Sequence, residues 1–354
     1  PAERPAIQRP AGVPLFHQLA EVESWQPSVV IVNGRLSPDW ESELCRHYPS
    51  IFFLHNFFGT CISGLKRHLS PSPMPCERVF GPACLGLYLP RRCGGRNPLT
   101  MIELYGRERA HLERLRGYRL LVTHAEHMRQ EYIRHGFDAA RVVVVPFACF
   151  RQLPSAQPKE EDASISGRVR VLFAGRMETI KGGAELIEAA RRFTQQTRQE
   201  LTLTMAGEGE QKEAWRKLAA QATSTAPGFE VVFPGWLSGG QLETAFQSHH
   251  LFAMPSLWPE PFGKGGMEAA RFGCPSIGFR IGGIPQWLSD GINGHLAEWR
   301  PDPARHLAEA LGRVFASEAH YALLRQGARA SAARFTAAAH CDALLPLLER
   351  VSAA

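Results

Sequence analysis

The sequence lacks any long apolar run. No stretch approaches the ~18–20 consecutive apolar residues that a helix needs to cross a bilayer. The Pro-rich start, PAERPAIQRPAGVP, also lacks the apolar segment of a secretory signal peptide. There is no internal repeat, coiled-coil pattern or low-complexity tract, and 44% hydrophobic with 21% charged residues excludes a disordered or fibrous chain. We therefore expect a globular, cytoplasmic protein.

A concentrated basic tract is also missing. The net charge is +6, but the Arg residues are scattered over many expected helices and are not interleaved with aromatics. This scatter argues against a nucleic-acid partner. An anionic small ligand and a membrane surface explain the charge equally well, so peripheral membrane contact stays open.

The length of 354 residues predicts two domains, because a single core rarely grows beyond ~250–300 residues. Residues 152–167, QLPSAQPKEEDASISG, are rich in Pro, Ser and charge and predict a linker. We place one domain at 1–155 and a second at 168–332. A final helix, at 333–354, is expected to cross back to the first domain.

Both halves alternate short apolar runs with amphipathic patterns, which is typical of doubly wound α/β domains with parallel sheets. Strands are predicted at 28–34, 51–56, 119–124 and 142–147 and, in the second half, at 169–175, 201–207, 229–235, 251–256 and 274–279. Helices are predicted at 101–116, 125–136, 182–196, 210–221, 239–248, 264–273 and 303–316. Residues 334–352 form a last amphipathic pattern, which Pro346 should kink.

The segment from MPSLWPEPFGKGG to SDGING carries the most specific pattern. It places Glu260 and Glu268 with seven residues between them, around a Phe-Gly turn. The pattern resembles the sugar-nucleotide signature of glycosyltransferase family 4, which has the two-Rossmann-domain GT-B fold. The matching positions are Pro255, Ser256, Glu260, Phe262, Gly263, Glu268, Gly273, Pro275, Gly282, Gly283, Pro285, Asp290, Gly291, Asn293 and Gly294. Two positions depart from the family pattern: Lys264 replaces the usual aliphatic residue, and Gln286 replaces the usual Glu.

The chemistry of this segment supports the resemblance. A Gly-rich turn that enters a helix presents backbone N–H groups to a phosphate, and Gly263 and Gly265 allow close approach of the ligand. Phe262 and Lys264 flank that turn. Glu268 has the reach to accept hydrogen bonds from ribose hydroxyls, whereas Glu260, before the turn, is expected to face the sugar.

A second pattern, VLFAGRMETIKGG, places Gly175 and Arg176 directly after a strand and Lys181 before a helix. The resemblance implies that Arg176 and Lys181 grip the donor diphosphate. Cations suit that position because the resemblance also implies catalysis without a bound metal, while the leaving diphosphate gains negative charge.

Three further residues carry weaker signals. The turn FPGWLSGG makes Trp236 and Leu237 candidates for contact with the donor base, although packing roles are equally open. His55 ends the strand IFFLHN and matches a His that many family members place beside the donor sugar. Its position at a crevice edge favours that function over a structural role.

Half of the eight cysteines fall within 33 residues. Cys61, Cys76, Cys84 and Cys93 lie in an inserted Pro- and Gly-rich loop, 59–98, and a long loop of this kind usually needs a staple. Four thiolates would suit a structural zinc, but the gaps of fourteen, seven and eight residues lack Cys-x-x-Cys knuckles. Free buried thiols are the alternative, and a reducing cytoplasm disfavours disulfides.

The resemblance implies a retaining glycosyltransferase that moves a sugar from a nucleotide-diphosphate-sugar donor to a hydroxyl acceptor, which is a glycan, a lipid-linked sugar or a small molecule. It also implies that 1–155 is an acceptor-binding Rossmann-like domain and that 168–332 is a nucleotide-sugar-binding one. Family members usually begin with a strand and a Gly-rich loop, and nothing before residue 28 supplies them. That departure favours one alternative, a non-catalytic sugar- or nucleotide-binding subunit. An epimerase or a phosphorylase fits the pattern less well.

Overall fold

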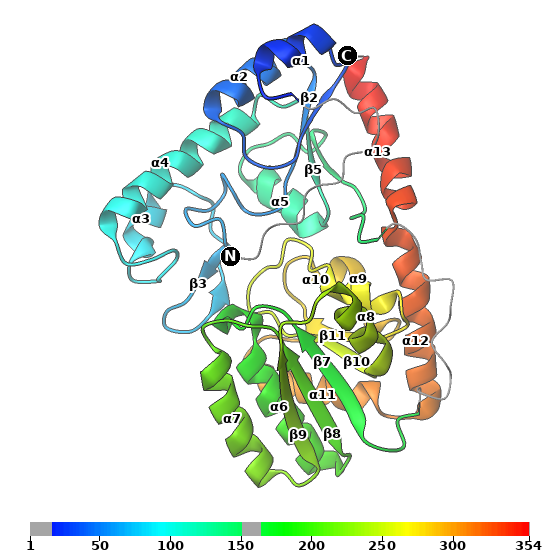
Figure 1. Cartoon of the computed structure of the whole chain (residues 1–354). Coiled ribbons are helices and arrows are strands. Elements are labelled where there is room, and N and C mark those ends of the chain that lie inside the picture. The colour runs from blue at the N-terminus through cyan, green and yellow to red at the C-terminus, as the bar shows by residue number, and fades with distance from the viewer. Residues whose placement is uncertain (1–15, 151–163, 354) are drawn as a thin grey trace.

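A computed structural model describes residues 16–150 and 164–353 of the chain, and it shows two α/β domains stacked end to end (Figure 1). The first domain contains a four-stranded parallel sheet in the order β1-β2-β5-β6. Its strands are β1 (Val30–Val32), β2 (Ser50–Phe53), β5 (Leu120–Thr123) and β6 (Val142–Val144). β2 and β5 are buried throughout, which explains why both read as continuous apolar runs.

The second domain contains a six-stranded parallel sheet in the order β12-β11-β10-β7-β8-β9. Its strands are β7 (Val169–Ala174), β8 (Leu201–Ala206), β9 (Phe229–Gly235), β10 (Leu251–Met254), β11 (Ser276–Phe279) and β12 (Gly294–Ala297). From β7 the strand order runs outward in one direction to β8 and β9 and in the other to β10, β11 and β12, so β7 and β10 flank the topological switch point. In such sheets ligands bind at the carboxyl ends of the strands beside that point.

Helices flank both sheets (Figure 1). In the first domain they are α1 (Leu19–Trp25), α2 (Pro38–His47), α3 (Ala83–Tyr88), α4 (Pro98–Leu115) and α5 (Glu126–Arg134). In the second they are α6 (Gly183–Thr197), α7 (Lys212–Thr225), α8 (Gly239–Ser248), α9 (Gly265–Ala270), α10 (Ile284–Trp287), α11 (Pro303–Val314) and α12 (Glu318–Ala332). Across residues 16–150 and 164–353, none of the helices is both long and apolar enough to traverse a bilayer.

The doubly wound prediction is confirmed: each predicted strand and each predicted helix overlaps an observed one. The sequence analysis missed β12, the short α1, α2, α3 and α10, and the long α12. It also placed the end of α9 too late, because a turn closes that helix at Ala270. Most of the predicted linker, 152–163, lies outside the described residues.

The inserted loop 59–98 is more ordered than its composition predicted. It forms a small hairpin, β3 (Arg67–His68) with β4 (Met74–Pro75), followed by α3. A buried ion pair fastens the insertion to α5, since Lys66 Nζ lies 2.7 Å from Glu131 Oε1 with both side chains almost fully buried. The backbone N–H of Phe80 also donates to His135 Nε2 on the same side of α5 (2.8 Å).

This ion pair supplies the staple for which the sequence suggested zinc. Among the described residues, no three His, Cys, Asp or Glu side chains come together in a way that could hold a metal ion. Cys61, Cys76, Cys84 and Cys93 are all free thiols. Burial and the nearness of the other three thiols raise the pKa of Cys93 to about 12, which favours its neutral form. The zinc expectation therefore finds no ligand set here.

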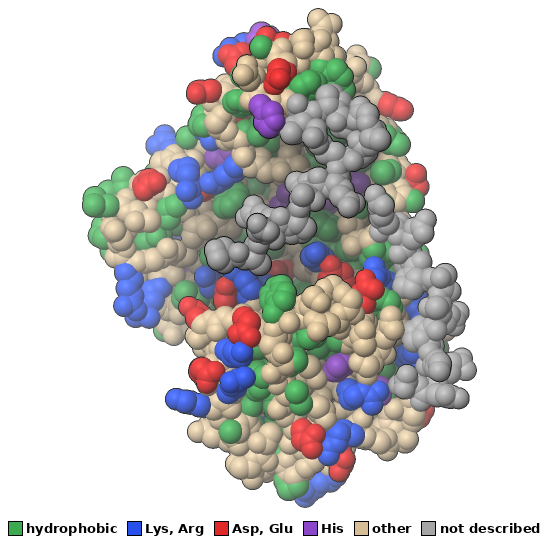
Figure 2. Space-filling view, in the orientation of Figure 1, with side chains coloured by type: hydrophobic (Ala, Val, Ile, Leu, Met, Phe, Trp, Pro, Cys, Tyr) green, Lys and Arg blue, Asp and Glu red, His purple; other side chains and the backbone are tan. Residues whose placement is uncertain are grey.

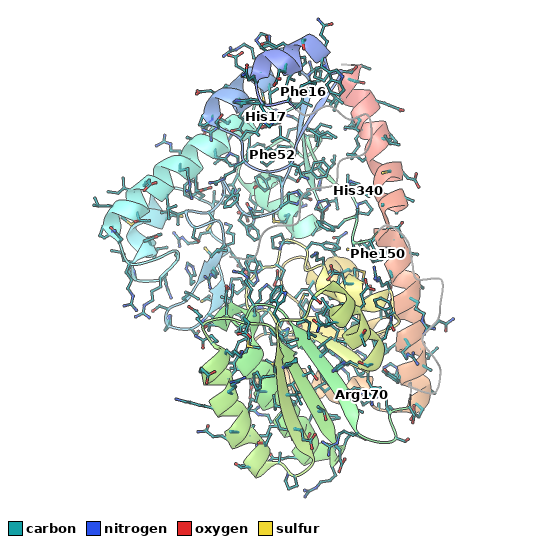
Figure 3. The ribbon with its side chains drawn as sticks, in the orientation of Figure 1. Phe16, His17, Phe52, Phe150, Arg170 and His340 are labelled. Carbon is teal, nitrogen blue, oxygen red and sulfur yellow. The ribbon has the colours of Figure 1, made fainter. Side chains whose placement is uncertain are left out.

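The last helix, α13 (Ala337–Ser352), packs on the first domain, as the sequence predicted (Figure 1). The helix continues through Pro346, and Val351 joins the buried cluster around Ile51 and Val122. Nearer its start, His340 Nδ1 donates to the Pro146 carbonyl (2.7 Å), and the ring lies beside the first domain (Figure 3). The C-terminus therefore ties the two domains together.

Replacing Val351 by Asp should lower the free energy of unfolding by about 2–4 kcal/mol, because an unpaired carboxylate would enter the apolar cluster under α13. Leu345→Asp is the matched control, since that side chain is 54% exposed on the same helix. Urea denaturation of both variants measures the difference. Equal losses would show that α13 does not dock as described.

Candidate active site

The carboxyl ends of β7, β8 and β10 surround a cavity within the second domain. Nine residues that the sequence analysis assigned to the donor site line it: Gly175, Lys181, Trp236, Leu237, Glu260, Gly263, Lys264, Gly265 and Glu268. We call this cavity the donor pocket. It adjoins a second cavity between the two domains, because Glu260, Gly263 and Lys264 line both.

An ion pair lies at the junction of these cavities. Lys181 Nζ is 2.6 Å from Glu260 Oε1, and the two side chains are only 19% and 9% exposed. Ser256 Oγ donates to the same carboxylate oxygen (2.7 Å). Lys181 comes from the loop after β7 and Glu260 from the loop after β10, so the pair joins two loops that the sheet order places side by side.

The glycines of the motif explain how these loops pack so closely. Gly182 has φ +70°, and a Cβ there would lie 1.8 Å from the Pro255 carbonyl oxygen. Gly282 has φ +57°, and its Cβ would meet the backbone of Glu260 at 2.6 Å. The N–H of Gly283 donates to the Glu260 carbonyl (2.7 Å). These positions therefore require glycine to hold Glu260 against the pocket.

Two aromatic side chains, Trp287 and Phe147, hold the Phe-Gly turn in place. Trp287 Nε1 donates to the Phe262 carbonyl (2.8 Å), and the Phe262 ring stacks on Phe147 of the first domain at 5.3 Å. Lys264 lies 3.1 Å from Glu268 and is 63% exposed, so this departure from the family pattern places a cation at the pocket's edge. Phe262 itself lines the cavity between the domains.

Two predicted residues lie at the margin. Arg176 follows Gly175, but its guanidinium pairs with Glu178 (2.6 Å), is 63% exposed and lines neither cavity. Contact with a donor would require it to turn away from Glu178. Trp236 lines the donor pocket although it is 67% exposed. An aromatic ring left exposed at a pocket's rim is available to stack on a ligand.

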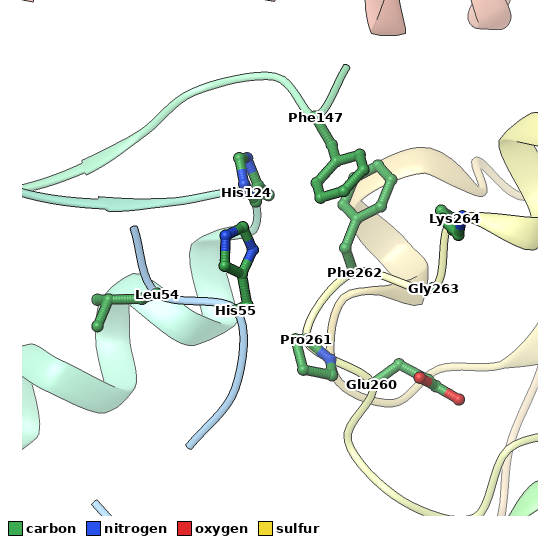
Figure 4. A pocket seen from close by; sticks show the side chains of 9 residues that line it. All are labelled: Leu54, His55, His124, Phe147, Glu260, Pro261, Phe262, Gly263 and Lys264. Carbon is green, nitrogen blue, oxygen red and sulfur yellow. The ribbon is translucent and has the colours of Figure 1, made fainter. Parts of the chain in front are cut away.

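Figure 4 shows the cavity between the domains, with His55 and His124 on one side and Glu260 on the other. The two imidazoles are stacked with centroids 5.5 Å apart, and His55 Nε2 hydrogen-bonds Asn33 Oδ1. His55 was predicted from the sequence as a site residue, whereas His124 was not. The same signal was present, because His124 also follows a buried strand, β5, at its carboxyl end.

Burial lowers the pKa of both histidines, and that of His124 falls to about 4. His124 Nδ1 lies 2.9 Å from the Val145 carbonyl, which assigns the proton to Nδ1 and leaves Nε2 as an acceptor. Nearby on α5, burial also lowers the pKa of His127 to about 3. The first domain therefore presents neutral imidazoles to the cavity at pH 7.

These buried histidines make stability depend on pH. Since the pKa of His124 is about 4 when folded and near 6.5 when unfolded, the unfolded chain binds the proton first, and stability falls as pH drops from 6.5 toward 4. Between pH 7 and 5, wild type should lose about 1–2 kcal/mol more than His124→Phe. Phe53→Leu, a neighbouring core change without a titratable group, should keep the wild-type slope in urea titrations. A parallel slope in His124→Phe would contradict the assignment.

Comparisons with known proteins place relatives beside this chain. Residues 157–331 match the family model described as glycosyl transferases group 1. A D-inositol 3-phosphate glycosyltransferase of Acidothermus cellulolyticus is 30% identical over 227 residues, which are 61% of this chain and 50% of that protein. A glycogen synthase of Mycobacterium tuberculosis is 35% identical over 162 residues, 46% of this chain and 34% of that protein. The chain thus spans a third to a half of these relatives' lengths.

Solved structures show the same fold. Sucrose-phosphate synthase from Thermosynechococcus elongatus aligns with a TM-score of 0.65 and 17% identity, over 95% of this chain and 76% of that one. The pneumococcal O-GlcNAc transferase GtfA, solved with UDP and GlcNAc, aligns with a TM-score of 0.62 and 14% identity, over 94% and 59%. The GT-B architecture predicted from the sequence is confirmed.

Proposed function

Because residues 157–331 make this chain a member of the glycosyl transferases group 1 family, we propose that it transfers a sugar from a nucleoside-diphosphate sugar to a hydroxyl acceptor with retention at the anomeric carbon. One observation carries the proposal: the Lys181–Glu260 pair stands where the donor pocket meets the cavity between the domains. We also propose a cytoplasmic role in glycan, polysaccharide or glycoconjugate synthesis, where the +6 charge suits a membrane surface.

The donor pocket offers one group for each part of a nucleotide sugar. The exposed Trp236 ring suits the base, and Glu268 suits the ribose hydroxyls. Lys181 supplies positive charge to the diphosphate as it leaves, and Arg176 adds to that charge once it releases Glu178. Glu260 then faces the sugar ring, at the boundary with the acceptor side.

The first domain supplies the acceptor side. Neutral His55 and His124 can orient hydroxyl groups without adding charge, because their pKa values lie below the usual range. The family mechanism lets the leaving phosphate itself take the acceptor's proton. The first domain therefore needs to supply only position and exclusion of water.

Lys181→Ala should lower kcat/KM roughly 30- to 1,000-fold, because the leaving diphosphate loses a charge-assisted contact. This loss corresponds to about 2–4 kcal/mol of transition-state stabilisation. Arg176→Ala should have a smaller effect in the same direction, since its side chain starts outside the pocket. Steady-state transfer assays and donor-hydrolysis assays measure both variants. Arg216→Ala, an exposed change on α7, is the control. Wild-type turnover in Lys181→Ala would refute the proposal, and donor binding without transfer by wild type would favour a non-catalytic subunit.

Glu268→Gln and Glu260→Gln should fail differently. Glu268→Gln should weaken binding of the bare nucleoside diphosphate, because the ribose loses its carboxylate acceptor. Glu260→Gln keeps an oxygen for Lys181 and Ser256 but loses the charge, so it should lower kcat while sparing diphosphate affinity. Calorimetry with the diphosphate, beside transfer assays, separates the two. Equal losses of diphosphate affinity would overturn this division of roles.

A further inference from the structure

A third cavity lies between the insertion and the second domain. It has a volume of about 270 Å³, and three guanidinium groups line it: those of Arg78 and Arg91 in the insertion and Arg300 in the second domain. Trp299 lines it too, and the guanidinium of Arg300 lies 3.9 Å from the centre of that ring. In the described part of the chain, no carboxylate lies within 4.0 Å of these three guanidinium groups, although the exposed Glu77 also lines the cavity.

A neighbouring cavity, which we call the middle cavity, provides a contrast. It too is lined by cations, Lys66, Arg134 and Arg280, but each has a carboxylate partner. Glu131 pairs with both Lys66 (2.7 Å) and Arg134 (2.5 Å), and Glu298 pairs with Arg280 (3.0 Å). Positive charge without a counter-ion is therefore concentrated in the third cavity, which we call the arginine cavity.

The pKa of a buried histidine beside these arginines is consistent with a positive potential in the cavity. His68 lines the arginine cavity, and its pKa is lowered first by burial and then by the positive charges of Arg91, Arg78 and Lys66. Figure 2 shows Lys and Arg side chains, with Asp and Glu side chains among them, where the insertion approaches the second domain. Uncompensated like charges that converge from separate segments favour an anion between them.

The arginine cavity adjoins the middle cavity, which reaches the loop that carries Glu260. It shares Pro75, Glu77 and Trp299 with the middle cavity. The middle cavity in turn is lined by Pro259 and Gly282, which adjoin Glu260 in the chain or in space. The middle cavity, beside α5, therefore lies between the three arginines and the loop that carries Glu260.

We infer that the acceptor of this chain carries an anionic group, a phosphate or a carboxylate, which the arginine cavity binds while a hydroxyl of the same molecule lies at the transfer point. The inference rests on the proposed function, because it assumes that the cavity between the domains receives an acceptor. The planar guanidinium groups suit either anion through paired N–H donors. Trp299 offers an apolar face to the ring or chain of the acceptor.

The test compares four probes by calorimetry on the full chain: glucose, glucose 6-phosphate, glucuronate and inorganic phosphate. At least one anionic sugar should bind tenfold or more tightly than glucose. Arg91→Gln and Arg300→Gln should each weaken that anionic sugar about three- to tenfold and leave glucose unchanged. Arg280→Gln is the matched control, because its partner Glu298 already balances it, and it should change binding less than twofold.

Three results would overturn the inference. The first is glucose that binds as tightly as both anionic sugars, and the second is an Arg280→Gln effect equal to that of Arg300→Gln. The third is inorganic phosphate that binds as tightly as glucose 6-phosphate, since the acceptor's sugar would then contribute nothing. Titration of a nucleoside diphosphate in the same variants separates the two proposals. Absence of diphosphate binding counts against the proposed function, whereas intact diphosphate binding without anion preference counts against this inference alone.

Discussion

The ion pair between Lys181 and Glu260 is the contact on which the site depends. Removing two charges from water costs several kcal/mol, and a buried pair offsets that cost only with good geometry and added hydrogen bonds. The 2.6 Å separation and the Ser256 hydroxyl supply both. A donor diphosphate would compete with Glu260 for Lys181. Under the proposed function that competition would release the carboxylate toward the sugar, so one pair would prepare both groups.

The sequence was sufficient to predict the loops that carry Lys181 and Glu260, although not β12, α10 or α12, because the constraints on those loops are local. A Cβ at Gly182 or Gly282 would clash with a neighbouring loop, so only glycine fits at these two positions. The same loops carry Lys181 and Glu260. Residues that support the loops were also visible in the motif, although their work is structural: Asn293 donates to the Trp287 carbonyl (2.7 Å) and accepts from the N–H of Ser289 (2.8 Å).

The first domain was harder to predict because its key contacts join distant parts of the chain. The staple of the insertion pairs Lys66 with Glu131, and no spacing rule links those two positions. Four cysteines in one loop suggested a metal because that signal is local and the ion pair is not. His124 follows a buried strand just as His55 does, but only the fold shows that the two rings stack on each other.

The two domains are linked through the loops that carry Lys181 and Glu260. Ile180, beside Lys181, and Trp258, two residues before Glu260, are buried in the hydrophobic cluster of the first domain together with Phe57. The N–H of Leu257 donates to the Ile180 carbonyl (2.8 Å), which joins the two loops at that point. A shift of the first domain therefore displaces the loops that hold the ion pair. The geometry of the Lys181–Glu260 pair thus depends on how the first domain packs against these two loops.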